Sequence, residues 1–216
     1  MLSQKIKTIL SKDPKMATLI EKIPHSQLQK LKSSKFQLRE YLILSIIGQQ
    51  LAIKAADAIK KKFIAQFENQ IPSSERILAT PDEILKSCGL STQKLNYIKN
   101  ISQYWIDNKL DKKDLVSLSD EELIELLTPI KGVGKWTVQM VLMFCLARPD
   151  VFAPEDYGLQ SAMVELYRLK QTGAELKKKT VLIAEKWKPY RTTACLYLWA
   201  FKDQNGSKNS KTKKYD

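Results

Sequence analysis

Apolar residues along the chain recur every three or four positions, which is the pattern of helices with one buried face. Leu38, Leu42 and Ile46 show this spacing, and the segment 123–127 repeats it. Strand-like alternation of apolar and polar residues is absent from the sequence. The pattern therefore predicts an all-α protein, with helices over residues 4–10, 14–23, 35–48, 54–68, 82–88, 92–108, 112–115, 120–127, 135–147, 157–168, 174–186 and 190–202.

Start and stop signals support several of these helices. Thr80-Pro81-Asp82-Glu83 places a capping residue and a proline at the start of a helix, and Ser119-Asp120-Glu121-Glu122 has the form of a capping box. Gly89 is expected to end one helix in the left-handed conformation, and Pro129 is expected to end another.

The length of 216 residues corresponds to one large domain or two small lobes, and the hydrophobic fraction of 44% is enough for a core. The longest runs without charge, residues 41–53 and 136–147, are shorter than the roughly 20 residues that cross a bilayer. The first residues lack the apolar stretch of a secretory signal. We expect a protein without a membrane span that stays in the cytoplasm, and three widely spaced cysteines that are reduced thiols.

The formal net charge is +13. The segment 202–216 holds five Lys and two Asp, which leaves +10 on the preceding residues. A basic body favours a polyanionic partner, either nucleic acid or an acidic membrane surface. Composition does not choose between these partners, and solvated lysines in a lysine-rich chain explain the charge equally well.

The segment 127–137 joins two predicted helices by a tight turn that contains Gly132-Val133-Gly134. Glycines let backbone N–H groups approach an external group closely, and the start of the following helix adds unpaired N–H donors. Lys131 and Lys135 flank the turn and add positive charge. The turn is therefore a candidate phosphate-binding site. The structural alternative is an ordinary turn between two helices that uses glycines for its backbone conformation.

Four ordered motifs resemble those of one enzyme family. Ile130-Lys131-Gly132-Val133-Gly134-x-Trp136-Thr137 resembles the hairpin of the helix-hairpin-helix (HhH-GPD) DNA glycosylases, and the segment 148–160 resembles their loop with the catalytic aspartate, which falls on Asp156. The segments 45–50 and 187–191, the latter with Trp199, resemble the bacterial DNA-3-methyladenine glycosylase II group. The resemblance covers residues 36–201, and it implies a two-lobed helical fold without the N-terminal β-sheet lobe of many members.

This resemblance implies hydrolysis of an N-glycosidic bond. The reaction leaves positive charge on the deoxyribose, which a carboxylate at its edge stabilises. Asp156 would supply that carboxylate, with Glu155 as the neighbouring rival. The structural alternative for Asp156 is an N-cap of the helix that starts at Tyr157, and the two roles are compatible.

Relatives that also cut the sugar–phosphate backbone carry a lysine nucleophile where this chain has Trp136. A tryptophan cannot form a Schiff base, and the side chain of Lys135 points about 100° away around the helix. We therefore expect a monofunctional glycosylase that leaves an abasic site. Iron–sulfur relatives need four closely spaced cysteines, which this sequence lacks.

By the same resemblance, Trp136 and Trp199 line the base pocket. Met140, one turn after Trp136, is expected as another wall of the pocket. Their electron-rich faces favour a purine made cationic by alkylation, such as 3-methyladenine or 7-methylguanine. Helix packing is the structural alternative for Trp199 and for Met140.

The enzyme must extrude the damaged nucleotide from duplex DNA, and Gln50 matches the position from which relatives insert a side chain into the gap. A capping or buried amide is the alternative for Gln50. The remaining DNA contacts are expected at the hairpin and at one basic residue of the last helix: Lys131, Gly132, Val133, Gly134, Lys135, Thr137 and Arg191. The resemblance also implies a Na⁺ or K⁺ ion on the backbone carbonyls of Thr128, Ile130 and Val133, while no cofactor is required for the chemistry.

The expected organisation has N-terminal helices over 1–35 packing with a C-terminal lobe over 148–202, a central lobe over 36–147 with the hairpin in 120–147, and a basic disordered tail over 203–216. We expect a bacterial monomer acting on double-stranded DNA with alkylated bases. A glycosylase for another lesion and a non-catalytic DNA-binding hairpin protein are the alternatives.

Overall fold

The computed structural model describes residues 2–28 and 37–212, with side chains as far as Asn205. The described part contains no strand and is built from α-helices and short 3-10 turns. The predicted all-α class is therefore confirmed. No helix among the described residues combines the length and the apolar character that a membrane span needs.

The chain divides into two compact units. The terminal unit comprises Met1–Leu31 and Ala147–Asp216, and the central unit comprises Lys32–Leu146. Its described helices are α3 (Leu38–Gly48), α4 (Ile53–Ala65), α5 (Ser74–Ala79), α6 (Asp82–Ser87), α7 (Thr92–Asp107), η2 (Leu110–Lys112), α8 (Asp120–Leu127) and α9 (Lys135–Phe144). Those of the terminal unit are α1 (Gln4–Leu10), α2 (Pro14–Lys22), η1 (His25–Gln27), α10 (Tyr157–Tyr167), α11 (Gly173–Ala184), η3 (Glu185–Trp187) and α12 (Arg191–Thr212).

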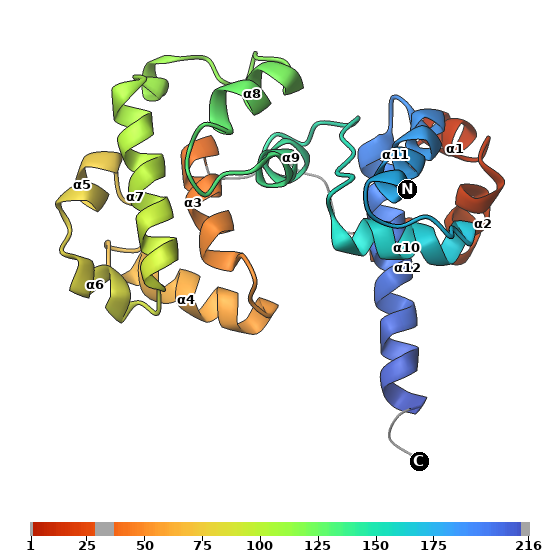
Figure 1. Ribbon diagram of the computed structural model, residues 1–216, viewed down its shortest axis with the longest axis horizontal. Helices are drawn as coiled ribbons and strands as arrows, with labels where there is room; N and C mark the ends of the chain where they lie inside the picture. Colours follow the sequence, from red (N-terminus) through yellow and green to blue (C-terminus); the bar gives the residue numbers. More distant parts are fainter. Residues whose placement is uncertain (1, 29–36, 213–216) are drawn as a thin grey trace. The chain divides into compact units, whose positions relative to one another are not determined.

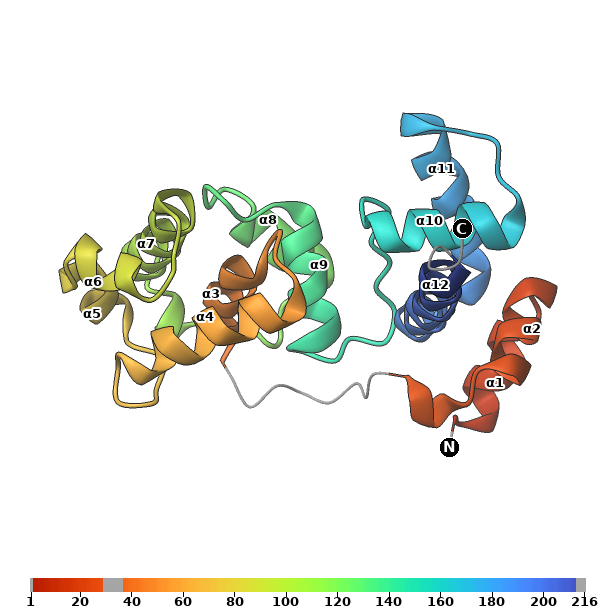
Figure 2. The same cartoon turned by 90° about the horizontal axis from the view of Figure 1, so that it is seen from below.

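Helix α3 is the core of the central unit. Its buried residues occupy most of the helix circumference, so that several neighbours must cover it; they are Leu38, Arg39, Leu42, Ile43, Leu44, Ile46 and Ile47. Helices α4, α7 and α9 pack on it, as Figures 1 and 2 show. Because α9 begins at the predicted hairpin, this packing fixes the hairpin to the core of the unit.

In the terminal unit, α10 and α12 pack against each other (Figure 1) and α2 packs on α12. The carboxylate of Asp13, at the start of α2, is 3% exposed and accepts hydrogen bonds from the Tyr167 hydroxyl (2.7 Å) and the Trp187 indole (3.2 Å). A buried carboxylate requires such partners. Asp13 thereby ties the N-terminal helices to elements more than 150 residues away in the sequence.

Helix boundaries differ from the predictions in a few places. Helix α5 was not predicted, because its six residues show no period and its start lacks the proline that marked the equally short α6. The helix predicted at 112–115 does not form: the 3-10 turn η2 ends at Lys112, and residues 113–115 are not helical. Thr80 does not cap α6: its hydroxyl donates to the Arg76 carbonyl, while Pro81 is the N-cap.

Helix α12 is longer than predicted. It continues through residues 203–212, which the sequence analysis assigned to a disordered tail. Hydrogen bonds from Lys202 to Ser161, from Gln204 to Gln27 and from Asn205 to Glu165 continue its packing within the terminal unit. Composition alone does not reveal such tertiary contacts. Residues 35–36 of the predicted helix at 35–48 and residues 213–216 of the predicted tail lie outside the described residues.

Candidate functional site

Asp156 is the N-cap of α10. Its Oδ1 accepts the Leu159 backbone N–H at 2.8 Å, which satisfies one of the N–H groups that lack a partner within the helix. The side chain is half-buried, whereas that of the neighbouring Glu155 is exposed. The capping role that the sequence offered for Asp156 is therefore confirmed, and its catalytic role stays a prediction.

Trp199 lies two turns into α12, and its indole faces Asp156. The Trp199 Nε1–H donates to the same Oδ1 atom at 2.9 Å. The carboxylate thus receives two hydrogen bonds, one from its own helix and one from α12. In this way the structure brings together two of the predicted site residues, Asp156 and Trp199, within the terminal unit.

Gly158 makes this arrangement possible, although it was not among the predicted site residues. A Cβ at position 158 would lie 3.1 Å from Asp156 Oδ1 and 3.2 Å from Trp199 Nε1 and Cδ1. These distances are tighter than ordinary van der Waals contacts, so a larger residue would push the indole from the carboxylate. The sequence signal that could have indicated this role is a glycine placed two residues after an aspartate at a predicted helix start.

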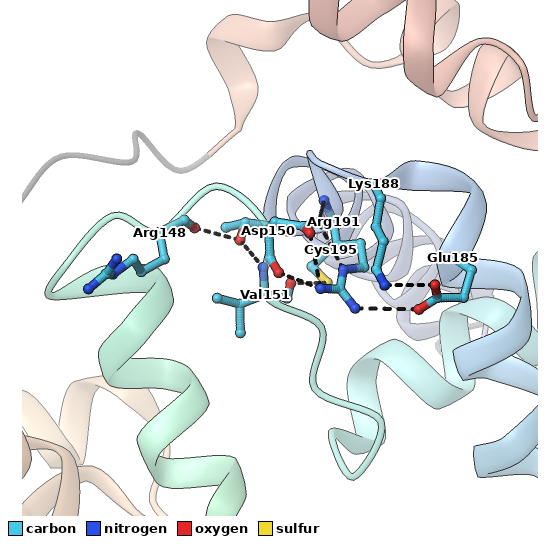
Figure 3. A network of polar contacts seen from close by, with 8 residues as sticks. Arg148, Asp150, Val151, Glu185, Lys188, Arg191 and Cys195 are labelled. Atoms are coloured by element: carbon cyan, nitrogen blue, oxygen red, sulfur yellow. Dashed lines mark hydrogen bonds and ion pairs between the residues drawn. The ribbon is translucent and has the colours of Figure 1, made fainter. Parts of the chain in front are cut away.

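The loop that leads to Asp156 is held by the first turn of α12. The Thr192 hydroxyl donates to the Arg148 carbonyl at 2.7 Å and accepts the Val151 N–H at 2.9 Å, and the Thr192 N–H donates to the Pro149 carbonyl at 3.1 Å. Figure 3 labels Arg148 and Val151 of this loop beside the start of α12. Because α12 also carries Trp199, one helix positions both the loop and the indole.

Arg191 takes part in the same network rather than standing on open surface. Its Nε donates to Asp150 Oδ1 at 2.8 Å, and one terminal nitrogen donates to Asp150 Oδ2 at 3.0 Å, while Glu185 lies 3.6 Å from the other (Figure 3). Lys188 pairs with Glu185 at 2.7 Å. These contacts give Arg191 a structural role in the loop, and the predicted phosphate contact stays a prediction.

In the central unit, the predicted hairpin forms as expected, with α8 ending at Leu127 and α9 starting at Lys135. Gly132 has a φ of +102°, and a Cβ there would lie 2.3 Å from the Tyr97 ring. Glycine is therefore required both by the backbone and by the close approach of α7. Around Gly134, the N-cap of α9, a Cβ would meet nothing within 4 Å, so an external group has room to approach.

A cavity of about 450 Å³ adjoins this turn. The hairpin lines it with Thr128, Ile130, Lys131, Gly132, Val133 and Gly134, and the rest of the lining comes from Gln49, Gln50, Gln93, Lys94 and Tyr97. The first residues of α9 direct backbone N–H groups without helical partners toward the same end of the hairpin. This combination suits an anion such as phosphate.

The expected cation ligands, the carbonyls of Thr128, Ile130 and Val133, belong to residues that all line this cavity. The Ile130 carbonyl also accepts the Val133 N–H at 2.9 Å, which leaves its second lone pair for another partner. Backbone carbonyl oxygens are the ligands that protein sites use for alkali cations. The residues present therefore fit Na⁺ or K⁺.

Thr137 differs from its prediction as a DNA contact. Its side chain is 3% exposed, and its hydroxyl accepts the Gln49 side-chain amide at 3.3 Å. The side chain is therefore used inside the central unit, and only the backbone N–H of Thr137 could meet a phosphate. Gln50 is exposed, as expected, and has a φ of +56°.

Trp136 and Met140 lie one turn apart on α9, so they share one face of the helix. Trp136 is 36% exposed, which is unusual for a tryptophan and suits a ligand-facing role. The expected base pocket takes these two residues from the central unit and Trp199 from the terminal unit, and it stays a prediction.

The cysteines are not positioned for chemistry. All three are buried, and burial raises the pKa of Cys145 to about 11 and raises the pKa of the Cys195 thiol. Neutral buried thiols are poor nucleophiles. Among the described residues, no group of three or more His, Cys, Asp or Glu side chains could hold a metal ion.

Comparison with known proteins identifies the family. Residues 43–189 match the HhH-GPD superfamily of base excision DNA repair proteins. The DNA-3-methyladenine glycosylase 1 of Schizosaccharomyces pombe is 39% identical over 162 residues, which cover 74% of this chain and 70% of the relative. The chain belongs to the HhH-GPD superfamily.

Two solved structures are similar to this chain over nearly the whole fold. A Schizosaccharomyces pombe 3-methyladenine DNA glycosylase in complex with abasic DNA has a TM-score of 0.79 and 34% identity, covering 91% of this chain and 95% of that chain. A DNA-3-methyladenine glycosidase of Bacillus halodurans has a TM-score of 0.78 and 32% identity, covering 95% and 92%. Because such relatives occur in a yeast as well as in bacteria, the expected bacterial source stays a prediction.

Proposed function

We propose that this HhH-GPD protein is a DNA glycosylase that removes alkylated purines by hydrolysing the N-glycosidic bond, in base excision repair. The related enzymes named above act on 3-methyladenine, and one of them was solved with abasic DNA, which is DNA that has lost a base. The observation that carries the proposal is the Asp156 carboxylate, fixed between the start of α10 and the Trp199 indole at 2.9 Å.

Asp156 would act on the sugar. As the glycosidic bond breaks, positive charge develops on the deoxyribose, and a fixed carboxylate stabilises it without having to reorient. The same carboxylate can accept a hydrogen bond from the attacking water and orient it. The cap at Leu159 and the bond from Trp199 supply the rigidity that this role needs.

A purine alkylated at N3 or N7 carries a positive charge and is a good leaving group, so general acid catalysis contributes little to its release. The indole faces of Trp136 and Trp199 would favour a cationic base over a neutral one. Trp136 stands where lyase relatives carry a lysine, and an indole forms no Schiff base. The proposed product is therefore an intact strand with an abasic site.

The hairpin would hold the DNA backbone. The N–H groups at the start of α9 and the lysines at 131 and 135 would contact a phosphate, while Gln50 would fill the gap left by the extruded nucleotide. The carbonyls of Thr128, Ile130 and Val133 would hold Na⁺ or K⁺, which when bound supplies positive charge for the same phosphate. We expect a monomer to carry out these steps.

The direct test is mass analysis of the bases that the protein releases from methylated duplex DNA. We expect 3-methyladenine and 7-methylguanine above the spontaneous rate. Release of deaminated or oxidised bases in their place would assign another lesion, and no release together with tight binding would leave a non-catalytic DNA-binding protein. Strand breaks should appear only after alkali, and borohydride should trap no covalent complex.

A further inference from the structure

The turn between α3 and α4 is held in a strained conformation. We call residues Gln49 to Ala52 the wedge turn, because Gln50 is the residue expected to enter the DNA. Gln50 has a φ of +56°, a left-handed conformation that is unfavourable for a non-glycine residue, and its side chain is exposed. Such a conformation persists only where the surroundings impose it.

One constraint comes from the hairpin helix. The Gln49 side-chain amide donates to the Thr137 hydroxyl at 3.3 Å, and Thr137 is buried in α9. This contact fixes the residue before Gln50 to the core of the central unit.

The second constraint comes from Lys94, which neither the resemblance nor the proposed function uses. Its ammonium donates to the Ile47 carbonyl at 2.7 Å, two residues before the wedge turn. Ile47 lies in the last turn of α3, where carbonyls have no partner within the helix and where a cation is favoured by the helix dipole. The ammonium therefore closes the end of α3 from which the wedge turn departs.

The position of Lys94 in its own helix makes this contact informative. Lys94 is the third residue of α7, at the helix end where the dipole disfavours a cation. Burial lowers the pKa of Lys94, so the charged group also pays a desolvation cost at this place. An ammonium extended into solvent would avoid the desolvation cost. The side chain instead contacts the end of α3, and this contact offsets both unfavourable effects.

The wedge turn, Lys94 and the hairpin also share one cavity, the cavity of about 450 Å³ described above. Displacement of the turn would therefore change the same space in which a phosphate is expected. Both constraints and the cavity lie within the central unit.

We propose that Lys94 is a positioning residue whose contact with the Ile47 carbonyl holds the wedge turn in the form that lets Gln50 occupy the gap left by an extruded nucleotide. This inference rests on the proposed function for the role of Gln50. It assigns no contact between Lys94 and the reacting atoms.

The experiment compares single-turnover release of 7-methylguanine from a duplex and from the same strand without its complement. Lys94→Met should slow release from the duplex about tenfold, as expected for loss of a hydrogen bond from a charged donor. Release from the single strand should be unchanged, because no base has to leave a stack, and this rate also reports the fraction of folded protein. Lys94→Arg should retain most of the duplex rate, because it can still donate to the carbonyl.

Two further variants isolate the mechanism. Lys99→Met removes the same charge from the same helix, but Lys99 pairs with Asp82, so both rates should match the wild type. Lys94→Met should add nothing to Gln50→Ala, because both changes act through one element. Equal slowing on both DNA forms, or additive effects of the two substitutions, would overturn the proposal in favour of a simple phosphate contact.

Amide hydrogen exchange gives a readout that needs no activity. Exchange at Gln49, whose backbone N–H donates to the Ser45 carbonyl at 3.1 Å, should accelerate in Lys94→Met and not in Lys99→Met. Unchanged exchange would refute the role of Lys94 even if the protein is a glycosylase. A wild-type protein without base release would instead refute the proposed function, and the exchange result would still decide whether Lys94 holds the turn.

Discussion

Substitution of Asp156 by asparagine separates the two roles of this side chain. Asparagine is nearly isosteric, and its Oδ1 can still accept the Leu159 N–H and the Trp199 indole N–H. Asparagine and aspartate are about equally good N-caps. The substitution therefore removes the negative charge while keeping the local structure.

The size of the effect follows from the charge. A carboxylate about 4 Å from a developing positive charge contributes about 4 kcal/mol at the effective dielectric constant of about 20 that suits protein sites. At about 1.4 kcal/mol for each factor of ten, the expected loss in the rate of base release is about 10³-fold. The change in unfolding free energy should stay within about 0.5 kcal/mol, since the cap is retained.

The assay is single-turnover release of 7-methylguanine from a defined duplex, with DNA affinity and thermal unfolding measured on the same samples. Asp156→Ala should lose the rate as well, and it should also lower stability by about 1 kcal/mol because the cap is lost. Glu155→Gln is the matched control, because its exposed carboxylate has no expected part in the reaction. Near-normal release by Asp156→Asn would refute the reasoning, and so would an equal loss in Glu155→Gln.

Three more predictions concern the framework of the site. Gly132→Ala should cost about 2 kcal/mol or more in thermal unfolding, because φ is +102° and the Cβ would lie 2.3 Å from the Tyr97 ring; Gly134→Ala, in open space, should cost far less. Asp150→Asn should lower the free energy of unfolding by about 1–3 kcal/mol, because it breaks the half-buried ion pair with Arg191. A much smaller loss would show that this ion pair does not hold the loop in place. Ellman's reagent should react slowly with the native thiols and rapidly with all three after denaturation; fast native labelling would contradict their burial.

The local part of the fold was predictable because its signals are carried by neighbouring residues. The capping box at Ser119 forms as its spacing indicated, and the Glu122 carboxylate accepts a hydrogen bond from the Ser119 N–H at 2.7 Å. Gly89 adopts the left-handed conformation, with a φ of +97°. Helix α5 was not predicted, because its six residues show no period, although Ser73 caps its start and the helix packs on α7.

The site shows the same division between local and tertiary information. Asp156 could be placed at the start of a helix from the order of residues around it, and this position is confirmed. The hydrogen bonds from Trp199 to Asp156 and from Val151 to Thr192 join residues more than 40 positions apart. No local sequence pattern encodes such contacts. Lys94 was missed for the same reason, since its partner lies 47 residues earlier.

The capping and catalytic roles of Asp156 support each other. A carboxylate that stabilises a developing charge is most effective when it does not have to move during the reaction. The cap fixes the carboxylate to α10, the indole fixes it to α12, and the Thr192 contacts fix the loop before α10 to that same helix α12. The interactions that would serve a purely structural aspartate are therefore the ones that a catalytic aspartate requires, and the loss of charge in Asp156→Asn is the change that tells them apart.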